Sequence, residues 1–190
     1  DHKVPQLWGL AVKEFISKGK PMTTPKDCRE LSKPTTASRM HMAVKASLQS
    51  EWMHRCGYVT KQSNKAFAAQ VSGAVETGAL TQAMMDEARD ERKSFGVAEW
   101  DIASAYPNCR HMLIQHYLWF YHVPEQECAE IHSFYERLFG YVKCTAPDNT
   151  WSTAWVPMRK GLFQGDPFSC PAWNGCFSLP LRHMARMLDM

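Results

Sequence analysis

The chain has no run of about 18 uncharged apolar residues, the length that a membrane-spanning helix requires. It also lacks the apolar N-terminal segment that directs secretion, and it begins Asp-His-Lys-Val-Pro without an initiator Met. Neither membrane insertion nor secretion is therefore expected. The absent Met indicates a fragment of a longer protein.

None of the seven cysteines forms a C-x-x-C pair, and their odd number argues against a disulfide framework. The eight histidines are equally scattered, so the sequence gives no signal of a zinc site. The absence of both patterns favours a reducing, intracellular compartment. The nucleus and the cytoplasm both remain open.

No dense basic run occurs, although the basic residues are unevenly distributed. Residues 1–60 carry ten Lys and Arg against five Asp and Glu, whereas the rest of the chain carries twelve against fourteen. A basic N-terminal segment suits a phosphate backbone, but an ordinary solvated surface can have the same balance. Charge alone therefore leaves nucleic-acid binding open.

Hydrophobic periodicity predicts a mainly helical N-terminal half. Apolar residues at helical spacing predict a helix over residues 5–18. An extended loop is expected over residues 20–34, where three prolines lie. Two helices follow, one over residues 38–57 with Ser38 as its cap and one over about residues 73–93. The apolar face of the 38–57 helix would comprise Met40, Val44, Leu48, Trp52 and Met53.

The C-terminal half mixes short strands with helices. Residues 97–102 are apolar at alternate positions, which predicts a strand. Helices are expected after Pro107, from Pro124 to about residue 138, and from residue 168 onward. Residues 141–156 predict a hairpin. The buried face of the helix after Pro107 would comprise Met112, Leu113, Tyr117, Leu118 and Tyr121. Together these elements predict an α+β fold dominated by helices.

The predicted strand over 97–102 carries an acidic residue, Asp101, and an aromatic residue, Tyr106, lies five positions after it. A carboxylate at a strand end is a rigid ligand for Mg²⁺, and the backbone carbonyl of Ile102 can add a second oxygen. Taken alone, an Asp in this setting is more often a turn residue or a helix cap. Asp101 is therefore a candidate metal ligand, and the support for this role has to come from other segments of the sequence.

A second segment with candidate binding residues directly precedes the C-terminal helix and reads Gln164-Gly165-Asp166-Pro167-Phe168-Ser169. Gly permits a backbone shape and a close approach that a Cβ would prevent, and Pro fixes φ where a helix begins. The Gln side chain can hydrogen-bond a substrate without carrying charge. Taken alone, such a run is a loop leading into a core helix.

Together the two segments resemble motifs A and B of reverse transcriptases, in the order and approximate spacing of that family. The resemblance implies the fingers and partial palm of a right-hand polymerase, rich in helices with a small antiparallel palm sheet. Residues 1–95 would form a fingers-like region and residues 96–190 a partial palm. Within the palm, residues 124–160 would be a helix and a hairpin inserted between the two motifs.

The resemblance also implies a role for each residue of the two motifs. Asp101 would be catalytic and would hold Mg²⁺ or Mn²⁺ together with the carbonyl of Ile102. The ring of Tyr106 would underlie the incoming sugar and exclude a 2′-hydroxyl. Gln164 and Gly165 would line the pocket for the nucleotide and the template. The residues that begin the helix under the template would be Pro167 and Ser169.

An upstream run, Cys28-Arg29-Glu30-Leu31-Ser32, is similar to the fingers segment of non-LTR retrotransposon and group II intron enzymes. In that segment a basic residue lies ten positions beyond the first Arg, and here that position is Arg39. By resemblance, Arg39 would contact the nucleotide triphosphate, since a guanidinium binds phosphate through charge-assisted hydrogen bonds. An ordinary exposed helix residue is the alternative. Glu30 departs from the family, which usually has Pro there.

The family's third motif, an aromatic-x-Asp-Asp turn that supplies the remaining carboxylates, is absent from the sequence. It would be expected beyond Met190, with the rest of the palm and the thumb of a parent polyprotein. We therefore expect the 190-residue chain to have no polymerase activity in isolation. We also expect the C-terminal helix to expose an apolar face.

The implied activity of the parent is RNA-directed DNA synthesis by a retroelement, using an RNA template, a DNA primer and deoxynucleoside triphosphates. Whether this chain is itself an enzyme is left open by the missing motif. One alternative is a non-catalytic remnant that binds nucleic acid or another protein. Another is an unrelated helical protein, in which Asp101 and Gln164 would lie far apart.

Overall fold

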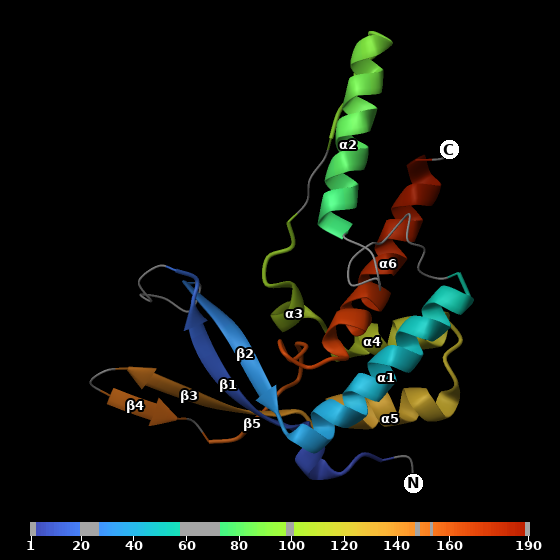
Figure 1. Cartoon of the computed structure of the whole chain (residues 1–190). Helices are drawn as coiled ribbons and strands as arrows, with labels where there is room; N and C mark the ends of the chain where they lie inside the picture. The colour runs from blue at the N-terminus through green and yellow to red at the C-terminus, as the bar shows by residue number, and fades with distance from the viewer. Residues whose placement is uncertain are drawn as a thin grey trace.

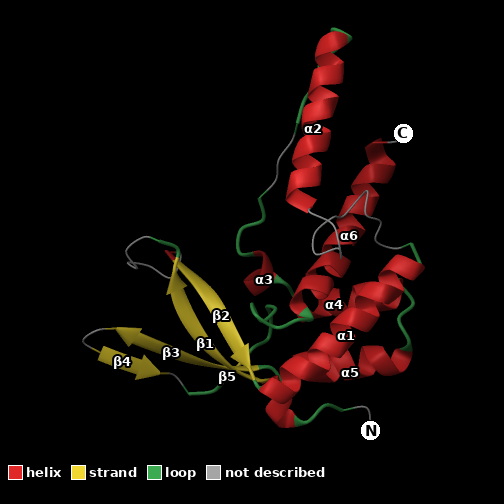
Figure 2. Ribbon diagram, viewed as in Figure 1, coloured by secondary structure: helices red, strands yellow, loops and turns green. Residues whose placement is uncertain are grey.

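The computed structural model describes residues 3–19, 27–57, 73–97, 101–146, 149–152 and 154–188, and these residues form a mixed α+β fold (Figure 1). The helices α1, α4, α5 and α6 lie together, and the strands extend to one side of them (Figure 2). The elements in chain order are η1 (Gln6–Gly9), β1 (Leu10–Ser17), β2 (Cys28–Pro34), α1 (Thr36–Arg55), α2 (Gly73–Asp90), α3 (Ala105–Asn108), α4 (His111–Phe120), α5 (Glu125–Glu136), β3 (Phe139–Ala146), β4 (Asn149–Ser152), β5 (Val156–Pro157) and α6 (Ser169–Leu188).

The strands of the described residues form one mixed sheet in the order β2-β1-β3-β4, with β5 added to β3. β1 runs antiparallel to β2 and parallel to β3, so the expectation of a purely antiparallel sheet is wrong. β3 and β4 pair in antiparallel fashion with Cys144 opposite Trp151, which confirms the predicted hairpin. The turn residues 147–148 lie outside the described residues.

The helix predicted over residues 5–18 is wrong, because Leu10–Ser17 form strand β1 after the short 3₁₀ helix η1. The apolar residues of this short segment have helical spacing and do not alternate, so their pattern alone does not reveal the strand. Strand pairing on both sides, with β2 and with β3, decides for the strand. The β-branched Val12 and Ile16 suit the extended backbone.

The predicted loop is also partly wrong, since its second half, Cys28–Pro34, is strand β2. The seven residues pair with β1 along its length, from Ser17 opposite Cys28 to Ala11 opposite Pro34. Pro34 is tolerated because it lies at the last position of a strand on the edge of the sheet. The loop residues 20–26 lie outside the described residues.

Helix α1 confirms the helix predicted over 38–57, with a different cap and a different inner face. The Thr35 side chain accepts a hydrogen bond from the Ser38 backbone N–H at 3.3 Å, so Thr35 is the cap. The predicted inner residues Met40, Val44 and Leu48 are exposed. The prediction is confirmed for Met53, which is buried, and Trp52 is partly buried against the core. The other buried residues of the helix are Ser38, Met42, Lys45 and Gln49.

An ion-pair network explains why a lysine lies on the inner face of α1. Lys45 Nζ lies 2.6 Å from Glu127 Oε2 and 2.6 Å from Glu130 Oε2, both on α5. Burial alone lowers the pKa of Lys45, but its hydrogen bonds to the two carboxylates outweigh burial and raise the pKa above its usual value. The charged network therefore joins α1 to α5.

We expect Lys45→Met to lower the free energy of unfolding by about 2 kcal/mol at neutral pH, because two partly buried carboxylates lose their cation. Urea unfolding measures the loss. Because the pKa of Lys45 is raised, its contribution is present below the unfolded-state pKa and is lost as pH rises through the folded value. The exposed Lys33, paired with Glu14, supplies the control. Equal losses in Lys45→Met and Lys33→Met would contradict this role.

Helix α2 confirms the helix predicted over about 73–93 and stands apart from the sheet and from α1 (Figure 1). Its described side chains are mostly exposed, including the apolar Val75 and Leu80. Its charged end faces solvent, as predicted, and Arg89 pairs there with Asp86 at 3.0 Å.

The core is centred on the packing of α4 against α6. Tyr117 and Tyr121 of α4 are fully buried, and the Tyr121 hydroxyl lies 2.6 Å from Ser178 Oγ on α6. The predicted buried face is therefore right for Tyr117, Leu118 and Tyr121. Met112 and Leu113 are exposed, and Ile114 is the buried residue in the first turn of α4. The helix predicted after Pro107 is interrupted between α3 and α4.

The helices predicted after Pro124 and from residue 168 are both confirmed, as α5 and α6. Pro124 immediately precedes α5, and Pro180 lies inside α6. Part of α6 is exposed, as with Met187 near its end. None of the described helices is both long enough and apolar enough to cross a membrane.

Candidate functional site

The strand predicted over residues 97–102 is not present at Val97, Asp101 or Ile102, and residues 98–100 lie outside the described residues. No strand of the described sheet pairs with Asp101 or Ile102, which both lie exposed before a turn. Ser104 then adopts a left-handed backbone with φ 51° and leads into α3. The alternating pattern of residues 97–102 therefore does not give a strand at Asp101 and Ile102, because no strand of the described sheet pairs with them.

The surroundings of Asp101 test how well it suits a divalent cation. Its carboxylate is exposed, and the described residues contain no group of three or more His, Cys, Asp or Glu side chains suited to a metal. A Mg²⁺ ion needs only one or two protein carboxylates when substrate phosphates and water complete its six ligands. One exposed carboxylate is compatible with that requirement, and the binding of a metal by Asp101 and the Ile102 carbonyl stays a prediction.

Tyr106 is held against the first turns of α6. Its hydroxyl donates to Cys170 Sγ at 3.3 Å, and its ring lies edge-on to Trp173 with centroids 6.1 Å apart. Burial, followed by the hydrogen bond to Cys170, raises the pKa of Tyr106 above its usual range. The phenol therefore stays protonated. Gln164 and Gly165 form a turn before α6, which we call the Q-G turn. The segment after Asp101 and the helix after the Q-G turn thus meet through Tyr106.

The segments 106–111 and 160–163 also lie side by side. The Gly161 N–H donates to Cys109 O at 2.7 Å, and His111 Nε2 donates to Gly161 O at 2.9 Å. Burial lowers the pKa of His111, so its imidazole is neutral at physiological pH. A Cβ on Gly161 would lie 3.1 Å from Pro107 O, which leaves little room for a larger residue.

The Q-G turn rests on the backbone of strand β2. The Ser32 N–H donates to Gln164 O at 2.7 Å, and Gly165 has φ +117°, which L-residues rarely adopt. A Cβ at Gly165 would lie 2.6 Å from Ser32 O, closer than real Cβ contacts. The prediction that this glycine permits an unusual backbone and a close approach is confirmed. Its contact with a nucleotide stays a prediction.

Asp166 follows the Q-G turn and is 3% exposed. Burial is the main cause that raises its pKa to about 7. The Phe168 N–H, Ser169 and the Arg39 guanidinium pull the pKa down, but no described group completes a hydrogen bond of normal geometry to the carboxylate oxygens. The sequence had indicated no role for Asp166, and the only signal was the position of this charged residue directly before the C-terminal helix.

The positive charge of Arg39, in the first turn of α1, lowers the pKa of Asp166, so the two side chains lie within electrostatic range of each other. Arg39 itself is exposed, so its guanidinium remains accessible to a ligand. Arg39 therefore lies in the neighbourhood of Asp166, and Gln164 lies two residues before Asp166 in the chain. These residues come from segments more than a hundred positions apart.

Ser169 is the first residue of α6, and Pro167 lies two residues before it, so both lie where the helix was expected to begin. The Ser169 hydroxyl donates to Phe163 O at 2.7 Å, and its backbone N–H donates to Asp166 O at 3.1 Å. Ser169 is buried by these contacts, and Pro167 is half-buried. Ser169 therefore stabilises the turn before α6, and its expected place under a template stays a prediction.

A scan against protein-family models found no match to the chain, and a search of curated proteins also found none. The fold and the site define a mixed α+β protein. Its Tyr106 segment, its Q-G turn and the first turn of α1 converge at the start of one long helix.

Proposed function

We propose that the chain is part of an RNA-directed DNA polymerase of the reverse transcriptase type, from a non-LTR or group II intron-like retroelement. The observation that carries the proposal is the contact of Tyr106 with Cys170 on the first turn of α6. Tyr106 belongs to the segment that resembles motif A, and Cys170 directly follows the run that resembles motif B. The two residues are 64 positions apart in the chain, yet they are in contact. If the two motifs were coincidental, as in an unrelated protein, there would be no reason for them to lie in contact in the fold.

The place of Arg39 supports the same proposal. The resemblance predicts that Arg39 binds the triphosphate, and Arg39 lies within electrostatic range of Asp166 in the turn that also contains Gln164. Residues 1–95 would correspond to the fingers and residues 96–190 to part of the palm. β1 pairs with β3 across this division, so the two regions share one sheet.

Each residue of the site would have a separate task in this function. The Arg39 guanidinium binds triphosphate oxygens, and the Gln164 amide hydrogen-bonds the nucleotide or the template. The ring of Tyr106 lies under the sugar and excludes a 2′-hydroxyl. Asp101 and the Ile102 carbonyl would hold Mg²⁺ or Mn²⁺, which neutralises developing charge on the transferred phosphate when it is bound.

A second candidate function is a non-catalytic domain that binds nucleic acid. The observation that favours it is that Asp101 has no cluster of further metal ligands around it within the described ranges. Such a domain would bind a primer and template through basic side chains, and its affinity would fall steeply as salt rises. A nucleotide would not change the affinity of such a domain for the primer and template.

The two functions predict different effects of a nucleotide on the affinity of the chain for a labelled DNA primer annealed to an RNA template. If the chain is a polymerase part, the deoxynucleotide complementary to the next template base, with Mg²⁺, should tighten the complex measured by fluorescence anisotropy. We expect Arg39→Ala to weaken that nucleotide's binding by at least about tenfold, because charge-assisted hydrogen bonds to phosphate are lost. Arg89→Ala, which removes an exposed arginine of α2, should have no effect.

The remaining outcomes are also informative. Binding without any nucleotide response would favour the non-catalytic function, and no binding at low salt would contradict both. Primer extension by the purified chain with Mg²⁺ is expected to give no product. Templated synthesis that Asp101→Ala abolishes would refute this expectation of inactivity while supporting the polymerase assignment.

A further inference from the structure

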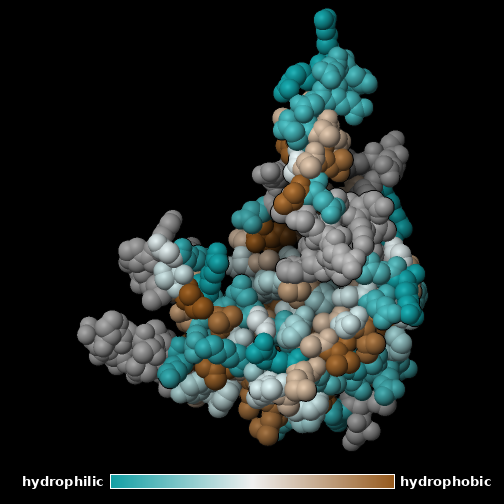
Figure 3. Space-filling model, in the orientation of Figure 1, coloured by the Kyte–Doolittle hydropathy of each residue, from teal (hydrophilic) through white to brown (hydrophobic). Residues whose placement is uncertain are grey.

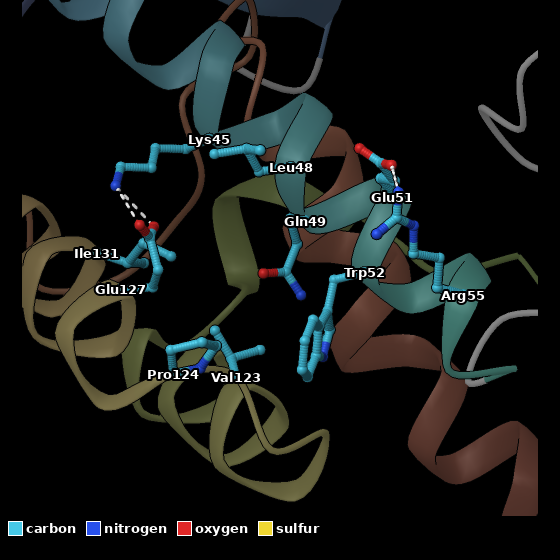
Figure 4. Close-up of a pocket in the computed structure, with 10 residues that line it drawn as sticks. All are labelled: Lys45, Leu48, Gln49, Glu51, Trp52, Arg55, Val123, Pro124, Glu127 and Ile131. Atoms are coloured by element: carbon cyan, nitrogen blue, oxygen red, sulfur yellow. Dashed lines mark hydrogen bonds and ion pairs between the residues drawn. The ribbon is translucent and has the colours of Figure 1, made fainter.

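A cavity of about 250 Å³ lies between α1 and α5, away from the Q-G turn (Figure 4). Its walls are largely apolar and include Leu48, Trp52, Val123, Pro124 and Ile131. A cavity of roughly 150 Å³ with apolar walls holds a benzene molecule, so this one has room for an aliphatic side chain and the peptide group that carries it.

The charged residues at the two ends of the cavity already have partners. Lys45 pairs with Glu127 at one end, and Arg55 pairs with Glu51 at 2.6 Å at the other, as Figure 4 shows. The Trp52 indole N–H also has a partner, since it donates to Tyr121 O at 2.9 Å. None of these groups requires a charged ligand, so the cavity favours a neutral one.

Gln49 is the exception among the residues that line the cavity. It is only 4% exposed, and its Nε2 has no hydrogen-bond partner within the part of the chain that the structure describes. Figure 4 shows its amide in the space between Trp52, Val123 and Pro124. A buried donor without an acceptor is unfavourable, and a ligand carbonyl would relieve it.

An exposed apolar row on α1 leads to the cavity. Met40, Val44 and Leu48 lie four residues apart on one face of the helix, and Leu48 also lines the cavity. Apolar surface lies over α1 in Figure 3. The row spans about 12 Å at 1.5 Å per residue, which is the length of about four residues of extended peptide.

We propose that this cavity binds an extended, neutral peptide segment of a partner protein. An aliphatic side chain of the peptide would pack against Trp52 and Val123, and the adjacent backbone carbonyl would accept a hydrogen bond from Gln49 Nε2. The segment is extended and not helical, because carbonyls inside a helix are already bonded within it. Further apolar residues of the peptide would lie along Met40 and Val44. The proposal is independent of the polymerase function.

The smallest probe of this site is N-acetyl-leucine-N′-methylamide, which has one aliphatic side chain and two peptide carbonyls. Titrated into the isotopically labelled chain, it should shift the NMR signals of the Gln49 side-chain amide and the Trp52 indole N–H. N-acetylglycine-N′-methylamide has the same carbonyls without the side chain and should cause no shift at equal concentration. Absence of shifts with the leucine probe, or equal shifts with both, would overturn the proposal.

Gln49→Met tests the hydrogen bond while preserving the length of the side chain. It should weaken binding of the leucine probe about tenfold, read from the Trp52 signal. Gln82→Met, on the exposed surface of α2, is the matched control and should bind as the unaltered chain does.

The stability of Gln49→Met separates a ligand contact from a structural one. Without probe, the variant should unfold at an equal or higher urea concentration, because it removes a buried donor that has no acceptor. A variant that unfolds at a lower urea concentration, or that binds the probe with unchanged affinity, would show that Gln49 supports the fold and would refute its role in binding.

Discussion

Replacing Gly165 by Ala should lower the free energy of unfolding by about 4 kcal/mol, through backbone strain and a steric clash together. The strain arises because φ is +117°, a region that is costly for any residue with a Cβ. The clash arises because that Cβ would lie 2.6 Å from Ser32 O, a backbone atom in a paired strand that cannot turn aside. Urea unfolding of the purified variant measures the loss.

Gly57→Ala is the control that separates the two causes. Gly57 also has a positive φ, +66°, but no described atom lies within 4 Å of the position that its Cβ would occupy. It should therefore cost only about 1 kcal/mol, the strain of a left-handed residue. Similar losses in both variants would show that the contact with Ser32 is unimportant. The difference between them measures how firmly β2 holds the Q-G turn.

Asp166→Asn should raise the free energy of unfolding by about 4 kcal/mol at pH 8 and change it little at pH 4. Burial raises the folded-state pKa of Asp166 from 3.8 to about 7, and each unit of such a shift is worth about 1.4 kcal/mol. Between these two values the folded chain keeps a proton that the unfolded chain releases. Stability therefore falls as pH rises through this window and levels off above it.

Urea unfolding at several pH values between 4 and 8 tests this dependence. The gain from Asp166→Asn should grow with pH, whereas Asp90→Asn, on the exposed surface of α2, should change stability by less than about 0.5 kcal/mol throughout. A loss of stability at pH 8 would mean that the ionised carboxylate is favourable in the fold, as a close pairing with Arg39 would make it. A gain that does not depend on pH would exclude titration of Asp166 as the cause.

Several elements could be predicted because their signals are local. The 38–57 helix has a polar cap near its start and Gly57 after its end, and the helix that became α5 follows Pro124. The hairpin of β3 and β4 joins segments only a few residues apart. In the site, the need for glycine at 165 was also predictable, because a Q-G turn before a helix restricts the backbone at that residue.

Other features depend on residues far away in the chain and were missed or mistaken. β1 pairs with β3, which places Leu10 opposite Phe139. The local sequence around Leu10 does not indicate which distant strand it pairs with. The inner face of α1 was mistaken because ion pairs with α5 select Lys45 over the apolar Val44. Asp166 is buried, although an aspartate is usually exposed and the local sequence does not indicate its burial.

The sequence by itself determined where most helices lie and which glycine and aromatic residues mark the candidate site. Each backbone hydrogen bond of a helix joins residues four positions apart, so the local sequence is enough to predict where a helix lies. The tertiary structure alone decided that residues 10–17 are a strand, that Tyr106 meets Cys170, and that Asp166 is buried near Arg39. Strand pairing and burial join residues that are distant in the chain, and only the folded chain brings them together.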